Sequence, residues 1–298
     1  MPFYSFGFPV VMAEGNHLFP SRTQSLSPPA PMVLQFFLWE SRTLPGIFYL
    51  EGSMGIEIEQ RTSKEKIDKL VSWIKEKIQD TGKKGAIFGL SGGIDSAVVA
   101  VLSKKAFPDN TMGLILPCES QLSDLQDAMK IIKRFNINYK QIDLTSIYHQ
   151  LLSIMKSNEH KIAEANIKPR LRMIVLYYFA NILDYLVVGT GNKSEISIGY
   201  FTKYGDGGVD ILPLGNTYKS EVKEIAKIIE IPEEIISKPP SAGLWKDQTD
   251  EKEMGFSYEL LDLFLASGEL EDKSLENDIS RMKQLSAHKR NTPSMPNF

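Results

Sequence analysis

The residues with the clearest potential for chemistry form a short segment, Ser-Gly-Gly-Ile-Asp-Ser at residues 91–96. Its glycines allow tight turns in which backbone N–H groups point into one concavity, and its serines add hydroxyl donors. A helix beginning here would add partial positive charge. Asp95 fits beside a polyphosphate only if it holds a divalent cation. The segment therefore predicts a phosphate-binding loop with a Mg²⁺ ligand, although an ordinary strand-to-helix turn fits it equally well.

The flanking sequence predicts the elements that would position this loop. Short apolar runs predict strands at 85–90, 111–116 and 186–189, and a further strand fits residues 139–143. Helical periodicity predicts helices from Thr62, where Glu65 completes a capping-box pattern, and at 94–106, 122–135, 171–185, 219–230, 256–265 and 275–285. The helix at 171–185 is apolar nearly all round, which predicts full burial. The alternation predicts an α/β fold, a Rossmann-like doubly wound parallel sheet with helices on both faces and its ligand cleft at the carboxyl ends of the strands.

The composition changes sharply near Met54. Residues 1–53 contain seven of the 16 prolines and seven of the 15 phenylalanines but no lysine. Prolines interrupt every apolar run in this stretch, and no period of 2 or 3.6 is sustained. Three interpretations are open: a disordered extension, a partner-binding segment, or upstream non-native sequence translated ahead of a start at Met54. We favour the last and expect one domain over residues 54–298.

Charge and cysteine content exclude several classes of protein. Thirty-four Lys and Arg residues against 37 Asp and Glu give a net charge of -3, so no nucleic-acid partner is expected. Cys118 is the single cysteine, which excludes a disulfide framework and Cys-cluster metal sites and fits a reducing compartment, the cytoplasm. No apolar run approaches the ~18–20 residues of a membrane helix, so no membrane partner is expected.

The 91–96 segment lacks the Gly-Lys-Ser/Thr ending of a Walker A loop and instead resembles the pyrophosphate loop of the N-type ATP pyrophosphatases. Within that superfamily, further blocks resemble NAD synthetases in their order and approximate spacing. These blocks are 166–173 (Asn-Ile-Lys-Pro-Arg-Leu-Arg-Met), 189–195 (Gly-Thr-Gly-Asn-Lys-Ser-Glu), 201–210 (Phe-Thr-Lys-Tyr-Gly-Asp-Gly-Gly-Val-Asp), 212–214 (Leu-Pro-Leu), 240–245 (Pro-Ser-Ala-Gly-Leu-Trp), 248–251 (Gln-Thr-Asp-Glu) and 288–290 (His-Lys-Arg). The resemblance covers nearly everything from Met54 onward. It implies the adenine nucleotide alpha hydrolase-like form of the Rossmann-like fold.

The same resemblance implies a reaction and a set of site residues. Deamido-NAD⁺, ATP and ammonia would give NAD⁺, AMP and pyrophosphate through an adenylated carboxylate. Asp95 and Glu195 would hold Mg²⁺ and, with Lys219, form the catalytic set. ATP would contact Gly89, Leu90, Ser91, Gly92, Gly93, Ile94, Asp95, Ser96, Thr190, Lys219 and Ser241. Deamido-NAD⁺ would contact Arg170, Lys203, Asp210, His288 and Lys289, and Asp210 is a candidate for taking the ammonia proton. Taken singly, Lys219 and Ser241 would instead be assigned to the exposed surface.

The nitrogen source is predicted from what the sequence lacks. Glutamine-dependent relatives carry an amidase domain of hundreds of residues, and the 53 residues before Met54 are far fewer than a typical domain. Cys118 is expected to be a small buried or cleft-side residue, not a nucleophile. Free ammonia is therefore expected, unless a separate amidase subunit supplies it. The resemblance also implies a homodimer to which residues 171–185 contribute, although core burial alone would explain their apolar pattern.

Three alternatives to this interpretation remain open. A tRNA-modifying pyrophosphatase is disfavoured because such relatives commonly need paired cysteines and a basic face. A GMP synthetase-like enzyme, which shares the chemistry, is disfavoured by the 201–210 block. A non-catalytic nucleotide sensor is disfavoured because it has less need of the two predicted metal ligands, Asp95 and Glu195.

Overall fold

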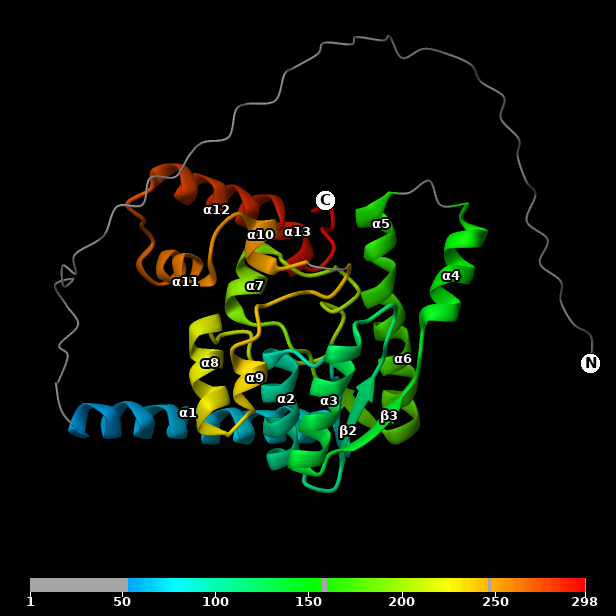
Figure 1. The fold of residues 1–298 in the computed structure, drawn as a ribbon, viewed down its shortest axis with the longest axis horizontal. Coiled ribbons are helices and arrows are strands. Elements are labelled where there is room, and N and C mark those ends of the chain that lie inside the picture. Colours follow the sequence, from blue (N-terminus) through cyan, green and yellow to red (C-terminus); the bar gives the residue numbers. More distant parts are fainter. Residues whose placement is uncertain (1–52, 157–159, 246–247, 298) are drawn as a thin grey trace, which may run out of the picture. The chain divides into compact units, whose positions relative to one another are not determined.

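The structure, a computed structural model, describes residues 53–156, 160–245 and 248–297 (Figure 1). The predictions made for residues 1–52 lie outside this part of the chain. The strands are β1 (Gly85–Gly89), β2 (Thr111–Ile115), β3 (Asn138–Gln141) and β4 (Tyr185–Val187). They form one parallel sheet in the order β3-β2-β1-β4, with Ile87 opposite Met112 on one side and Val187 on the other. The predicted parallel α/β fold is confirmed.

The strand order determines where a ligand can bind. The chain runs outward from β1 through β2 to β3, then returns to place β4 on the opposite side of β1. The order therefore reverses between β1 and β4, and in open α/β sheets ligands bind outside the carboxyl ends of the strands at such a switch point. The segments that follow these two strands are the 91–96 loop and residues 189–195.

Helices cover both faces of the sheet, as the sequence predicts. On one face, Phe88 of β1 packs in a core with residues of α1, α2, α3 and α8, including the fully buried Ile74 and Ile225. On the other face, Ile87 packs with α4 and α6. The helices are α1 (Ser53–Asp80), α2 (Ile94–Ala106), α3 (Leu122–Phe135), α4 (Thr145–Ile154), α5 (Lys161–Ala165), α6 (Ile167–Leu183), α7 (Lys193–Ile198), α8 (Lys219–Ile228), α9 (Glu233–Ile236), α10 (Asp250–Met254), α11 (Tyr258–Ser267), α12 (Lys273–Leu285) and α13 (Ala287–Arg290).

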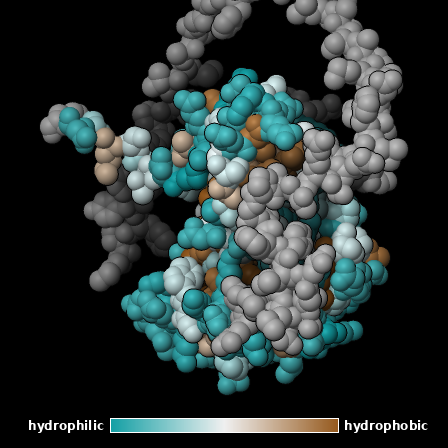
Figure 2. Space-filling model, turned by 90° about the vertical axis from the view of Figure 1, so that its left-hand side faces the viewer, coloured by the Kyte–Doolittle hydropathy of each residue, from teal (hydrophilic) through white to brown (hydrophobic). Residues whose placement is uncertain are grey.

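A third, smaller core packs the C-terminal helices against α7, the helix that follows β4. Ile198 of α7 packs there with Met254, Leu261 and Ile279, which belong to α10, α11 and α12. Figure 2 shows a largely hydrophilic face on this side, with hydrophobic residues in patches at the level of α11 and α12 in Figure 1. Within the described residues, every helix is too short or too polar to span a lipid bilayer.

Two predictions about helices are wrong. Helix α1 begins at Ser53 and runs through Thr62, because the intervening Glu, Gln and Arg residues are themselves good helix formers. Helix α6 is not fully buried: Ile174, Tyr178 and Ile182 are 58%, 61% and 60% exposed. These three residues are spaced four apart and so form one stripe along the helix. A helix that is apolar all round has no polar stripe to mark its outward side, so the sequence could not identify this face.

Candidate active site

The 91–96 loop connects β1 to α2 and holds its shape through its own serines. The Ser96 hydroxyl donates to the Gly93 carbonyl oxygen at 2.9 Å and accepts the Ser91 N–H at 3.2 Å. The Ser91 hydroxyl accepts the Gly93 N–H at 3.2 Å. The serines, predicted as donors to a ligand, therefore make hydrogen bonds within the loop. Gly89 ends β1, Leu90 is buried directly after it, and Ile94 begins α2, whose N-terminus carries partial positive charge.

Gly92 is the position in this loop that only glycine can fill. Its φ of +85° lies in the left-handed region, and a Cβ built there would lie 2.2 Å from the Asp124 carbonyl oxygen. Glycine has no Cβ and tolerates both conditions. The N-terminal turn of α3 thus packs directly against the loop.

Asn192, the N-cap residue of α7, forms hydrogen bonds with both predicted metal ligands, Asp95 and Glu195. The Asn192 side chain accepts the Glu195 N–H at 3.0 Å, and Glu195 accepts the Asn192 N–H at 3.2 Å, which completes a capping box. The Asn192 amide also donates to Asp95 at 2.9 Å. Asn192 is fully buried and was missed in the sequence analysis, although its Asn-x-x-Glu spacing is a recognisable helix-start signal.

Lys219, the first residue of α8, brings the predicted catalytic set together. Its ammonium contacts the Asp95 carboxylate and lies 3.2 Å from Glu195 Oε1. The side chain is only 2% exposed, so the surface assignment suggested by Lys219 alone is wrong. Burial would lower the pKa of Lys219, but the carboxylates of Asp95 and Glu195 raise it above its ordinary value, and the lysine stays charged.

Helix α8 is anchored so that Lys219 points into this site. The Lys219 N–H donates to the Ser194 hydroxyl at 3.0 Å, and that hydroxyl donates to the buried Asp262 carboxylate. The Ser220 N–H donates to the second Asp262 oxygen at 2.9 Å. Asp262 therefore accepts hydrogen bonds at the N-terminus of α8, where a negative charge is favourable.

The charge balance of the site favours a divalent cation. Three largely buried carboxylates, Asp95, Glu195 and Asp250, surround the single ammonium of Lys219. Burial raises the pKa of Glu195 to about 7, with Lys219 acting in the opposite direction. Mg²⁺ is commonly bound by one or two carboxylates together with substrate phosphates. Asp95 and Glu195 fit that pattern, and the described residues contain no cluster of three or more ligands that would make a complete protein cage.

Four of the residues predicted for the second substrate, Arg170, Lys203, His288 and Lys289, form a separate group. Lys203 donates to the His288 carbonyl oxygen, and Arg170 donates to the Lys203 carbonyl oxygen at 3.2 Å. Lys289 donates to the carbonyl oxygens of Gly199 and Phe201 at 2.7 and 2.9 Å, and burial lowers its pKa. The structure thus places cationic side chains from α6, the 201–210 loop and α13 side by side.

Asp210 and Ser241 occupy different surroundings. Asp210 accepts the Tyr177 hydroxyl at 2.9 Å and the Val187 N–H at 2.8 Å, which fixes its carboxylate beside the end of β4. Ser241 is exposed and accepts the Gly243 N–H at 3.1 Å. Thr190 is half-buried in the segment after β4. The described contacts do not join Thr190 or Ser241 to the carboxylate cluster.

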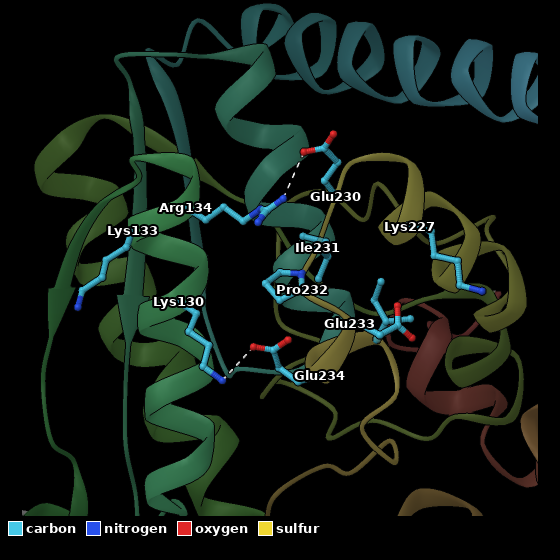
Figure 3. A pocket seen from close by; sticks show the side chains of 10 residues that line it. Lys130, Lys133, Arg134, Lys227, Glu230, Ile231, Pro232, Glu233 and Glu234 are labelled. Carbon is cyan, nitrogen blue, oxygen red and sulfur yellow. Dashed lines mark hydrogen bonds and ion pairs between the residues drawn. The ribbon is translucent and has the colours of Figure 1, made fainter.

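A surface pocket between α3 and the segment joining α8 to α9 contains none of the predicted site residues (Figure 3). Arg134 and Glu230 pair across it at 3.2 Å, and Lys130 pairs with Glu234 at 3.3 Å. Its lining is of mixed charge. The concentration of buried charge lies instead at the carboxyl ends of β1 and β4.

Comparison with known proteins decides the family. A family model described as NAD synthase matches residues 66–294. The chain belongs to the NAD synthase family. The NH(3)-dependent NAD(+) synthetase of Carboxydothermus hydrogenoformans is 50% identical over 236 residues, which cover 78% of this chain and 97% of the relative.

Two solved structures are similar to this chain over most of its length. One is an NMN synthetase from Francisella tularensis, 41% identical with a TM-score of 0.76 over 79% of this chain and 99% of that one. The other is an NH3-dependent NAD synthetase from Campylobacter jejuni, 32% identical with a TM-score of 0.66 over the same shares. The two names differ in the nucleotide product, so substrate choice needs its own test.

Proposed function

We propose that this NAD synthase family member is a C–N ligase that amidates deamido-NAD⁺ with ammonia, using ATP and releasing NAD⁺, AMP and pyrophosphate. The observation that carries the proposal is the contact of Lys219 with Asp95 and Glu195 beside the 91–96 loop, at the switch point of the sheet. The similarity to NH(3)-dependent NAD(+) synthetases over 97% of a relative supports the same activity.

Each part of the site has a role in this reaction. The nicotinate carboxylate attacks the α-phosphorus of ATP, the bond to the β-phosphate oxygen breaks, and pyrophosphate leaves. The 91–96 loop and the α2 N-terminus bind the departing pyrophosphate, and Lys219 stabilises its negative charge. Asp95 and Glu195 would hold Mg²⁺, which neutralises phosphate charge when bound. Catalysis then rests on positioning and electrostatics, without a covalent nucleophile from the protein.

The second half-reaction consumes the acyl-adenylate. Ammonia attacks the carbonyl carbon, the bond to AMP breaks, and one ammonia proton must leave. Asp210 is our candidate acceptor, because each carboxylate oxygen keeps a lone pair beyond the bond it accepts from Tyr177 or Val187. Arg170, Lys203, His288 and Lys289 would bind the anionic dinucleotide. Thr190 and Ser241 would complete the ATP site.

A second candidate substrate is the mononucleotide, nicotinic acid mononucleotide. The similarity to the Francisella tularensis NMN synthetase favours it, since that structure matches at higher identity and TM-score than the Campylobacter jejuni NAD synthetase. The adenylating chemistry is the same for both substrates. Only the contacts to the adenosine monophosphate half of deamido-NAD⁺, which the mononucleotide lacks, would differ.

The test is product formation by the purified chain with ATP and Mg²⁺. Deamido-NAD⁺ and nicotinic acid mononucleotide are compared as acceptors, and ammonium and glutamine as nitrogen donors. We expect NAD⁺ from deamido-NAD⁺ with ammonium but not with glutamine, and no product from Asp95→Ala. Amide formed mainly from the mononucleotide would select the second candidate. Product from glutamine alone would contradict ammonia dependence, and no product from either acceptor would direct attention to other adenylation reactions.

We also propose that the exposed stripe of α6 forms a homodimer interface. Ile174, Tyr178 and Ile182 present adjacent apolar side chains that a monomer would leave in water. Ile174→Asp is expected to convert a dimer into a monomer, as measured by light scattering after size exclusion. Leu263→Asp on α11 is the control, because Leu263 is 48% exposed but belongs to another helix. A dimer that persists in Ile174→Asp would reject this interface.

The domain boundary at Met54 is a further proposal. Deleting residues 1–53 is expected to leave the melting temperature and the amidation rate unchanged, because the family match begins at residue 66. A deletion variant that fails to fold would rule out an upstream, non-native origin for the segment. A cytoplasmic location and a separate amidase partner also remain predictions.

A further inference from the structure

The structure assigns Tyr258 and Asp250 as positioning residues that tie the metal-binding carboxylate Glu195 to the backbone next to Ser241. The inference rests on the proposed function in one respect: it takes Glu195 and Ser241 to be parts of one ATP site. Among the hydrogen bonds of the described residues, those of the Tyr258 and Asp250 side chains go to one another, to Glu195 and to Tyr200, and none reaches the 91–96 loop. Their effect would pass through the residues they hold.

The first link joins Glu195 to Asp250 through a buried phenol. Tyr258 is 1% exposed, and its hydroxyl donates to Asp250 at 2.9 Å while lying 3.4 Å from Glu195 Oε1. The ammonium of Lys219 lies 5.0 Å from the centre of the Tyr258 ring. One side chain therefore contacts both Glu195 and the lysine that neutralises it.

The second link joins Asp250 to the segment that carries Ser241. The Asp250 N–H donates to the Pro240 carbonyl oxygen at 2.9 Å, and Pro240 directly precedes Ser241. The other carboxylate oxygen of Asp250 accepts the Tyr200 hydroxyl at 3.2 Å. Asp250 is 4% exposed, so its orientation is set by these bonds and not by water.

A third set of bonds fixes the far end of the same segment. Tyr200 also contacts Glu253 at 2.7 Å, and Glu253 accepts the Gln248 amide at 2.7 Å. The Gln248 side-chain oxygen accepts the Leu244 N–H at 2.8 Å. The network therefore holds the segment containing Ser241 at Pro240 and at Leu244. A shift of this segment would be transmitted through Asp250 and Tyr258 to Glu195.

Tyr258→Phe tests the link while keeping the ring that packs beside Lys219. The affinity for ATP is measured by calorimetry with and without Mg²⁺, in the absence of the nicotinate substrate. We expect about a tenfold loss of affinity with Mg²⁺, as for one lost hydrogen bond to a charged group, and a smaller loss without it. In turnover assays, the KM for ATP should rise while the KM for deamido-NAD⁺ stays within about twofold, as expected for one missing bond at the ATP site alone.

Two further variants keep the test decisive. Tyr185→Phe makes the same change at the opposite end of β4, where the Tyr185 hydroxyl donates to the Asn110 side-chain oxygen at 3.3 Å, and it should leave ATP affinity unchanged. Asp250→Asn should weaken binding in the same Mg²⁺-dependent way if Tyr258→Phe does not fold. Equal losses with and without Mg²⁺, or no loss, would overturn the proposal. Because binding is measured without the nicotinate substrate, an enzyme that binds ATP but makes no NAD⁺ would reject the proposed function and leave this test intact.

Discussion

Replacing Lys219 with methionine is expected to reduce kcat/KM for amidation by at least about a hundredfold. The loss of one preorganised hydrogen-bond donor in a comparable site costs about 3–4 kcal/mol of transition-state stabilisation. Methionine keeps an unbranched apolar stem but removes the ammonium that contacts Asp95 and Glu195. Steady-state rates with saturating ATP and ammonium measure the effect. A variant with wild-type turnover would contradict the role given to Lys219.

The same substitution should also destabilise the fold. Asp95 and Glu195, with side chains only 17% and 16% exposed, would lose their counter-ion, and breaking a buried ion pair costs about 3–5 kcal/mol. Lys66→Met is the matched control. Lys66 of α1 pairs at 2.6 Å with Glu221, which belongs to α8 like Lys219, but both side chains of this pair are about one-third exposed. We expect that control to lower the free energy of unfolding, measured by urea denaturation, by at most about 1 kcal/mol.

The destabilisation by Lys219→Met should depend on pH in a defined direction. Burial raises the pKa of Glu195 to about 7 from its ordinary 4.5. Between pH 4.5 and pH 7, Glu195 therefore keeps its proton in the folded protein but has lost it in the unfolded chain. The stability contributed by this group is therefore present below pH 4.5 and is lost as the pH rises through 7. Lys219 lowers the pKa of Glu195, so this pKa should be higher still in Lys219→Met. The variant should therefore go on losing stability at pH values above 7, where the wild type no longer does. The gap in melting temperature between variant and wild type should be smaller at pH 5 than at pH 8; an equal gap at both would contradict this assignment.

The parallel sheet was predictable chiefly from β1, β2 and β4, which are short, largely buried runs that alternate with helical periods. Strand β3, with the sequence Asn-Tyr-Lys-Gln, is exposed at every position and has no such pattern. The predicted bounds of α2 and α3 match the structure, since each helix follows a loop of small or polar residues. Helices α7 and α10 were missed because six and five residues are too few to establish a period. Their positions depend on tertiary bonds, such as the one from Asn192 to Asp95, which lies 97 residues away in sequence.

The candidate site was only partly predictable for a related reason. Asp95, Glu195 and Lys219 stand in motifs that resemble a known family, so their roles could be expected before their contact was seen. Asn192 has the sequence signature of a helix cap, and Tyr258 that of a core aromatic residue. Nothing local distinguishes a buried tyrosine that packs from one whose hydroxyl also joins two carboxylates. That information exists only once α7, α8 and α11 have packed together.

Gly92→Ala is expected to have the second largest effect, through the shape of the 91–96 loop. Alanine at a φ of +85° is strained by about 1–2 kcal/mol, and its Cβ would lie 2.2 Å from the Asp124 carbonyl oxygen. That oxygen belongs to backbone within α3, which cannot move aside as a flexible side chain could. The loop or the helix must therefore shift, and the loop N–H groups that we propose bind the phosphates would lose their arrangement.

Two further variants separate these contributions. Gly82→Ala has a similar φ of +70° but no atom within 4 Å of the added Cβ, so it should show the conformational strain alone and keep wild-type activity. Gly93→Ala places its Cβ no closer than 3.4 Å to the Ser91 hydroxyl and has an ordinary φ of -88°, so its melting temperature should stay near wild type. We expect Gly92→Ala to lower the melting temperature more than Gly82→Ala and to abolish ATP binding. If Gly92→Ala and Gly82→Ala prove equally stable, the close approach of α3 to the loop does not constrain this position.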